Sequence, residues 1–169
     1  MDTAAFEDFT RRFQAGMTDP EQVIRLFVEA MLTVETDRDL AEQLFCVVIA
    51  RNLLTAAPGT PSGHRLPRPD QTLNRLAASP AIARSLAGGT TAAAYQDADL
   101  AKVALDRAYS ARTQGVDYPS PGRGKFFVAC GGAATPRPLT LARNDAGGWK
   151  VVEWSSLTVG VARAGAGDF

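Results

Sequence analysis

The sequence predicts an α+β fold in which N-terminal helices pack on a C-terminal curved antiparallel sheet of 3–4 strands. Two observations carry this prediction. Residues 125–161 contain short apolar segments, rich in β-branched and aromatic side chains and separated by Gly, Pro and Asn-Asp, which is the pattern of strands joined by turns. Residues 20–54 carry apolar side chains at helical spacing, so they supply helices that cover one face of the sheet.

An amphipathic helix is predicted over residues 2–16. Phe6, Phe9 and Phe13 recur at helical spacing, so their rings form one stripe. This stripe either packs on the domain's own core or docks a protein partner or a second copy of the chain. We divide the chain into an N-terminal amphipathic helix extension at 1–17, a single α+β domain at 18–162 and a flexible tail at 163–169.

Two longer helices are predicted next. Asp19 is a good N-cap and Pro20 suits the first helical position, and apolar residues follow at helical spacing. A further helix begins near residues 36–37 and is expected to reach Leu54. Its middle, LFCVVIA, is apolar all round, which predicts a central buried helix.

The middle of the chain is less regular. Residues 55–69 contain four Pro and two Gly, which predicts a long loop without regular structure that carries the only histidine, His64. Short helices are expected over residues 70–78 and 80–87. Residues 102–112 suit a helix by propensity, but their alternation of apolar and polar side chains favours a fourth strand beside the sheet.

Three strands are predicted near the C-terminus, at residues 125–130, 138–143 and 149–155. The sequence NDAGG at 144–148 predicts the turn of a hairpin between the last two. In the last strand, apolar side chains occur on both faces, which suits a central strand or one rolled against helices.

Composition fits an ordinary globular domain without a cofactor. The 169 residues suffice for a core, and no run of about 18 apolar residues or signal-peptide pattern occurs, so we expect a cytoplasmic location without membrane contact. Cys46 and Cys130 are then expected to be free thiols. One histidine and no CxxC argue against a zinc site. The net charge of zero, without a clustered basic face, argues against nucleic-acid binding.

Catalytic motifs are missing, so no catalytic residue is assigned. The sequence has neither a G-x-S-x-G motif nor a phosphate-binding loop, and His64 is expected to be a solvated loop residue. Glu153 lies in an apolar strand, where it either forms a cross-strand ion pair with Arg137 or Arg143, or lines a pocket with a raised pKa. Arg137 and Tyr109 are the other expected polar residues of such a pocket.

Three segments resemble those of an uncharacterised bacterial domain family. They read SGHRLPRP at 62–69, LAGGTTAAAYQ at 86–96 and ACGGAATPRPLTLARNDAGGWKVVEWSSLTVGV at 129–161. The family has an SGFRL-type loop, a GGTP…Y segment and a closing pattern SGADSPRPVTLRKN…GLWKVYEFSSLLVGV. The resemblance covers residues 20–161, leaves the helix at 2–16 outside, and implies no catalytic role for His64, where the family has Phe. The order of helices and sheet is also similar to the cone-shaped fold of nuclear-transport-factor-2-like proteins.

Two classes of function are therefore expected. The first is a non-catalytic protein-interaction module: an accessory, adaptor, chaperone or immunity-type protein, for example of a secretion or toxin system. The lack of catalytic groups and the stripe of phenylalanines favour it. The alternative is a small-molecule binder or enzyme that uses the cavity of a nuclear-transport-factor-2-like fold, with Glu153, Arg137 and Tyr109 as its polar lining.

Overall fold

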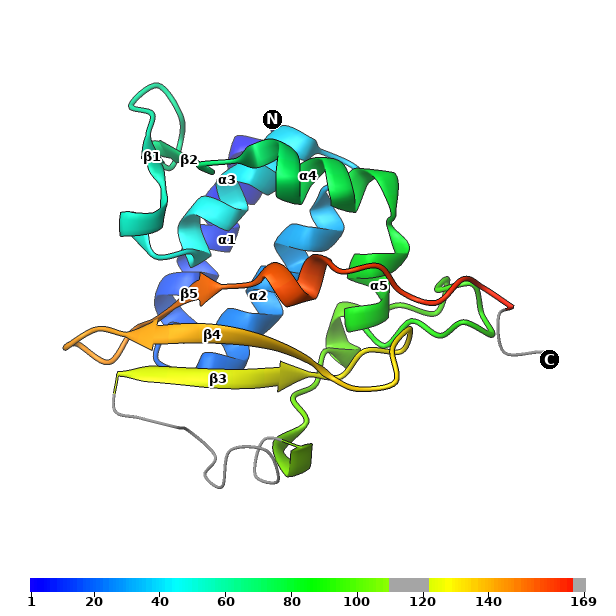
Figure 1. Ribbon diagram of the computed structural model, residues 1–169. Helices are drawn as coiled ribbons and strands as arrows, with labels where there is room; N and C mark the ends of the chain where they lie inside the picture. The colour runs from blue at the N-terminus through cyan, green and yellow to red at the C-terminus, as the bar shows by residue number, and fades with distance from the viewer. Residues whose placement is uncertain (110–121, 166–169) are drawn as a thin grey trace.

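N-terminal helices and a C-terminal three-stranded antiparallel sheet form the α+β architecture that the sequence predicts (Figure 1). The computed structural model describes residues 1–109 and 122–165. Its α-helices are α1 (Thr3–Gly16), α2 (Pro20–Thr33), α3 (Arg38–Val48), α4 (Pro69–Ala78) and α5 (Ala81–Leu86). Short 3-10 helices are η1 (Arg51–Leu53), η2 (Leu100–Lys102) and η3 (Ser155–Thr158). The strands are β1 (Thr55–Ala56), β2 (His64–Arg65), β3 (Arg123–Val128), β4 (Arg137–Arg143) and β5 (Trp149–Glu153).

Aspartate N-caps begin the first three helices. The side chains of Asp2, Asp19 and Asp37 accept hydrogen bonds from backbone N–H groups in the first turns of α1, α2 and α3, at 3.0, 3.0 and 2.9 Å. Each cap satisfies a donor that has no partner within the helix. The start of α2 at Pro20, directly after its Asp19 cap, is therefore confirmed.

The third helix is shorter than predicted. It ends at Val48 because Ile49 is extended and forms a parallel bridge with Val151 of β5. The backbone N–H of Ala50 then donates to the carbonyl of Val151 at 2.9 Å. This segment covers the outer edge of β5, an edge that would otherwise present unpaired backbone groups.

The sheet has the order β3-β4-β5, and both pairs are antiparallel. The observed strands begin and end within two residues of those predicted. The hairpin turn between β4 and β5 is confirmed, since the Asn144 backbone N–H donates to the carbonyl of Gly148 at 2.9 Å. Gly147 has a φ of 88°, a conformation that favours glycine.

The predicted fourth strand over residues 102–112 is wrong for its described part. Only Leu105 bridges to Val128 of β3. Directly after it, the Asp106 side chain accepts a hydrogen bond from the backbone N–H of Tyr109 at 2.8 Å and starts a helical turn. Asp favours such caps and is disfavoured in strands, which explains the early end of the pairing. Residues 110–112 lie outside the described residues.

Residues 55–69 are more regular than predicted. The two residues of β1 pair with those of β2 in a small antiparallel ladder, and Pro69 already belongs to α4. Buried Gln43 of α3 holds the connecting turn, because its Oε1 accepts hydrogen bonds from the backbone N–H and the hydroxyl of Ser62, at 3.1 and 2.6 Å. The segment therefore forms a turn held against α3 instead of an irregular loop.

The core lies between the helices and one face of the sheet. In Figure 1, α2 passes behind the strands, and its side chains Val23, Ile24 and Phe27 are fully buried. They share one apolar cluster with Leu141 of β4 and Val151 of β5. Burial of this shared face is the main source of stability for such an arrangement.

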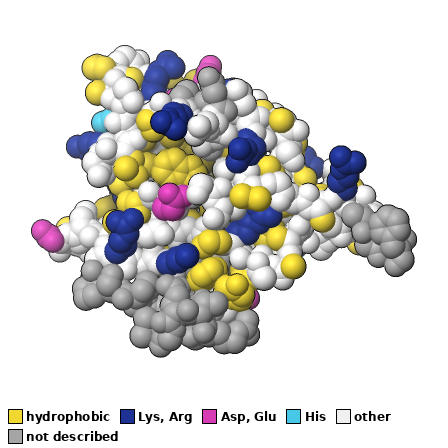
Figure 2. Space-filling view, in the orientation of Figure 1, with side chains coloured by type: hydrophobic (Ala, Val, Ile, Leu, Met, Phe, Trp, Pro, Cys, Tyr) yellow, Lys and Arg dark blue, Asp and Glu magenta, His cyan; other side chains and the backbone are white. Residues whose placement is uncertain are grey.

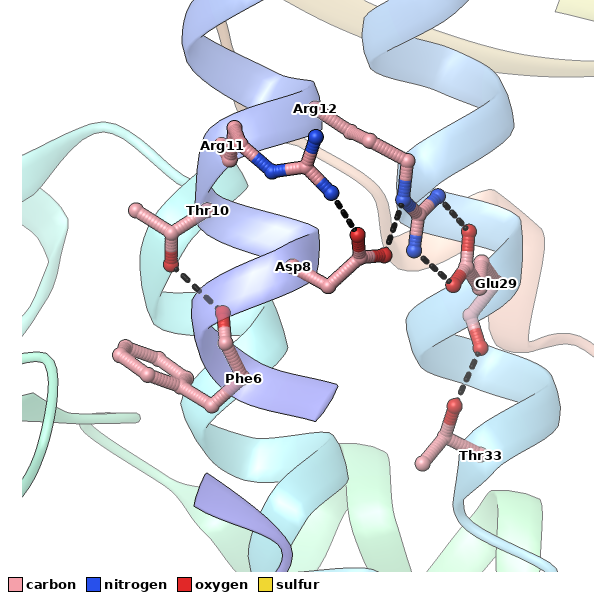
Figure 3. Close-up of polar contacts among 7 residues, drawn as sticks. All are labelled: Phe6, Asp8, Thr10, Arg11, Arg12, Glu29 and Thr33. Carbon is pink, nitrogen blue, oxygen red and sulfur yellow. Dashed lines mark hydrogen bonds and ion pairs between the residues drawn. The ribbon is translucent and has the colours of Figure 1, made fainter. Parts of the chain in front are cut away.

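The N-terminal helix belongs to the same core. Phe9 and Phe13 are only 1% and 5% exposed and are part of the main apolar cluster. Arg12 joins α1 to α2 through two hydrogen bonds to Glu29, at 2.7 and 2.6 Å, and also bonds Asp8 (Figure 3). Helix α1 therefore packs into the same core as α2. Of the expected tail at 163–169, residues 166–169 lie outside the described residues.

Candidate functional site

A groove of about 420 Å³ lies between α4 and the segment formed by the end of β5 and η3. We call it the α4–η3 groove. Its lining consists of Leu53, Leu66, Pro67, Arg68, Gln71, Thr72, Arg75, Val152, Glu153, Trp154, Ser155 and Thr158. Figure 2 shows the hollow open to solvent, with hydrophobic side chains on its floor and Lys and Arg side chains around it.

Trp154 is held in a fixed position at this groove. Its indole N–H donates to the hydroxyl of Thr72 on α4 at 3.3 Å. Its ring also packs at 6.2 Å from the ring of Phe27 on α2. Because two helices position the indole, it offers a preformed apolar surface whose ordering costs little when a ligand binds.

Two arginines lie on the α4 side of the groove. Arg68 directly precedes the first residue of α4 and Arg75 lies in its last turn, and both side chains line the groove. Both side chains are exposed, and neither guanidinium has a hydrogen-bond or ion-pair partner among the side chains that the structure describes. The groove therefore offers two cationic donors to a ligand.

Glu153 lines the groove, as the pocket alternative predicts. Its carboxylate, however, is not the protonated acid of that alternative. Its carboxylate accepts hydrogen bonds from the hydroxyl and the backbone N–H of Ser155, the latter at 2.7 Å. These hydrogen bonds hold the pKa of Glu153 below its usual value, so the alternative of a pocket acid with a raised pKa is wrong. No ion pair joins it to Arg137 or Arg143 in the described structure.

Arg137 and Tyr109 do not reach the groove. Arg137 instead donates to the backbone carbonyls of Ser156 and Gly160, at 3.4 and 2.7 Å, and so holds the segment after η3 against β4. The ring of Tyr109 packs at 4.9 Å from that of Phe127 on β3. Of the three expected pocket residues, the structure places only Glu153 in the lining.

The aromatic stripe of α1 is mostly unavailable for docking. Phe9 and Phe13 are buried among α1, α2 and α3, which agrees with the alternative that the stripe packs on the domain's own core. Phe6 is only partly buried and lines a second hollow.

This second hollow has a volume of about 390 Å³, and we call it the Lys150 pocket. Lys150 of β5, Arg51 of η1 and His64 of β2 contribute its basic side chains. The Lys150 ammonium lies 5.5 Å from the centre of the Phe13 ring, and burial lowers its pKa, with the nearby charge of Arg51 adding to this effect.

Neither Cys46 nor His64, which both line the Lys150 pocket, is in a state that favours nucleophilic catalysis. Burial raises the pKa of the Cys46 thiol to about 11, so the thiol is protonated near neutral pH. His64 is half-buried and not fully solvated, and its Nδ1 lies 2.9 Å from the carbonyl oxygen of Ser62, to which it donates. Within the described part of the chain, no group of three or more His, Cys, Asp or Glu side chains is arranged to hold a metal ion.

The residues that sequence reasoning missed come from segments far apart in the chain. Trp154 and Arg68 both occur in the segments that carried the family resemblance, but no pattern joins them. Lys150 alternates with buried Trp149 and Val151, a strand pattern that places it on the opposite face from the core.

Among the described residues, no helix has the length and apolar character required to cross a membrane.

The comparisons with known proteins identify a family but no activity. The chain matches the family described as a domain of unknown function, DUF6935, over residues 3–165, and it belongs to that family. The expected resemblance to an uncharacterised domain family is confirmed, and the match includes α1, which we had expected to lie outside it. No curated protein and no solved structure matches the chain, so the similarity to nuclear-transport-factor-2-like proteins stays a prediction.

Proposed function

We propose that the chain is a non-catalytic protein-interaction module whose α4–η3 groove binds a partner segment with a large apolar side chain next to acidic residues. One observation carries this proposal. Trp154 forms a fixed apolar surface, and Arg68 and Arg75 beside it have no ionic partner within the described residues.

The composition of the groove suits recognition of a protein segment. Trp and Arg are the residue types that most often dominate protein interfaces, particularly where they surround a pocket. The groove is open to solvent along its exposed side, so it can admit part of a longer chain (Figure 2). An extended or helical segment can therefore lie along α4 while one apolar side chain contacts Trp154.

The positive charge of the two arginines in the groove favours a partner segment that carries acidic residues. Arg68 and Arg75 present two guanidinium groups, and Glu153, the one carboxylate among the described lining residues, is already hydrogen-bonded to Ser155. Arg binds carboxylates through two parallel hydrogen bonds, which adds direction as well as charge. A segment with Asp or Glu near its apolar side chain satisfies both arginines.

The proposal includes a non-catalytic role in the cytoplasm. Its support is that the Cys46 thiol is protonated near neutral pH and that the Nδ1–H of His64 is engaged by a backbone carbonyl. Both cysteines are free thiols, the state that a reducing compartment maintains.

A peptide-display selection on the immobilised protein tests this function. Peptides enriched on the unmodified chain are expected to combine a Trp, Phe or Leu with neighbouring Asp or Glu. The counter-target is the double variant Arg68→Glu/Arg75→Glu, in which the rim charge is reversed on two exposed side chains. An enriched peptide should bind this variant at least about tenfold more weakly, because close like charges replace two favourable contacts.

The matched control is Arg163→Glu, a charge reversal at an exposed arginine that does not line the groove. It should leave peptide affinity unchanged. The proposal is refuted if the selected peptides are basic or uncharged, or if they bind the double variant and the unmodified chain equally well. Sedimentation of the unmodified chain over a range of concentrations tests the other expected partner, a second copy of the chain.

A further inference from the structure

The Lys150 pocket brings basic groups together over an apolar floor, and the proposed function does not use it. Lys150, Arg51 and His64 reach it from three different elements, whereas Phe6 and Phe13 of α1 contribute apolar surface. The described residues that line the pocket include no Asp and no Glu. Its electrostatic character is therefore that of a site for a negative group.

Lys150 is more buried than Arg51. Its ammonium has no hydrogen-bond acceptor or ion-pair partner among the residues that the structure describes, and it lies 5.5 Å from the centre of the Phe13 ring. Burial and the charge of Arg51 lower its pKa, which shows that its surroundings disfavour the charged form. A partly buried cation in this condition gains stability when an anion is placed beside it.

We propose that the Lys150 pocket binds a small organic anion, in which Lys150 and Arg51 hold a carboxylate or phosphate group and an apolar body contacts Phe6 and Phe13. The volume of about 390 Å³ is within the range of small-molecule sites. The guanidinium of Arg51 suits the two oxygens of either anionic group, and the ammonium of Lys150 adds a compact charge. The apolar floor favours an anion that carries an aromatic or aliphatic body over a bare inorganic ion.

Isothermal titration calorimetry with four probes tests this site. Phenyl phosphate and phenylacetate each carry an anionic group on an aromatic ring, inorganic phosphate lacks the ring, and benzyl alcohol lacks the charge. Saturable binding is expected for phenyl phosphate or phenylacetate, and the stronger of the two identifies the preferred group. Inorganic phosphate and benzyl alcohol should each bind at least about tenfold more weakly. Inorganic phosphate lacks the ring that contacts Phe6 and Phe13, and benzyl alcohol lacks the charge that Lys150 and Arg51 hold.

Two variants assign the binding to this pocket. Arg51→Gln changes an exposed side chain, and Lys150→Met replaces a half-buried one by an unbranched, uncharged side chain that is one atom shorter. Each should weaken binding about tenfold or more, as expected for a lost hydrogen bond to a charged group. Arg75→Gln, in the α4–η3 groove, should have no effect, so failure here is distinguishable from failure of the proposed function. If Lys150→Met fails to fold by circular dichroism, Arg51→Gln alone decides. No saturable binding of either aromatic anion, equal binding of inorganic phosphate, or unchanged affinity in Arg51→Gln overturns the proposal.

Discussion

Replacement of Phe9 by Ala tests whether α1 is an integral part of the domain. The Phe9 side chain is 1% exposed and lies in the main apolar cluster. Truncation to Ala therefore removes a buried ring and leaves a cavity that the surrounding helices fill only partly. If α1 were a separate extension, the same change would leave the rest of the chain stable.

The expected cost is about 3–5 kcal/mol in the free energy of unfolding, the usual range for a buried Phe→Ala change. A domain of this kind has a total stability of about 5–15 kcal/mol, so the variant loses a large share of it. With a urea dependence of about 2 kcal/mol per molar, the unfolding midpoint should fall by about 2 M.

Urea unfolding followed by far-UV circular dichroism measures this shift. Phe6→Ala is the matched control, because Phe6 lies on the same helix and stripe but is only partly buried. It should cost about 1 kcal/mol, in proportion to the smaller apolar area that it removes from water. A loss below about 1 kcal/mol in Phe9→Ala, or equal losses in both variants, would show that α1 does not share the core.

Three further predictions concern the packing and the charges of the fold. Gly131→Ala should destabilise the chain by about 1–3 kcal/mol in thermal or urea unfolding, because the added methyl would lie 2.0 Å from a backbone carbonyl oxygen. The control Gly160→Ala adds a methyl group in open space and should have no effect. The carboxylate of Glu153 has a lowered pKa, so it stabilises the fold at pH values above its unfolded pKa of about 4.5 and loses this contribution as the pH falls. The urea midpoint of Glu153→Gln should therefore differ from that of the unmodified chain less at pH 3 than at pH 7. A double-mutant cycle of Arg12→Met and Glu29→Gln should give a coupling of about 0.2–1 kcal/mol, and a value near zero would mean that the paired geometry of Figure 3 adds no stability.

Sequence reasoning succeeded where the determining interactions are local. The helix start at Pro20 depends on the Asp19 side chain directly before it, and the turn between β4 and β5 depends on Asn144 and Gly147. These residues fix the backbone within a few positions of themselves, so their effect can be predicted from a short window.

The errors arose where a local pattern competes with a second signal or with distant contacts. Alternating side chains after Lys102 favoured a strand, but Asp106 caps a helical turn and ends the pairing after Leu105. The helix expected to reach Leu54 ends early because Val151, a residue far along the chain, offers Ile49 a strand partner. Helix propensity does not contain that information.

The candidate sites were hardest to predict, since each joins residues from distant segments. Glu153 was recognised as unusual for its place in an apolar strand, and the structure does place it in the α4–η3 groove. Neither alternative for its side chain describes its actual contacts: Ser155, two residues later, donates two hydrogen bonds to its carboxylate and lowers its pKa. Whether a side chain faces a pocket or its own backbone is decided by rotamers, which a sequence pattern does not specify.

Both candidate sites depend on one strand. Trp149 and Val151 of β5 point into the core and hold the strand in place, which leaves the alternate residues free for other contacts. Lys150 opens into one site and Val152 into the other, and η1 contributes residues to both linings. A change to the core face of β5 would therefore disturb both sites together, whereas Arg75→Gln and Arg51→Gln each alter one. Loss of the same binding activity in both of these exposed variants would contradict the assignment of two separate sites.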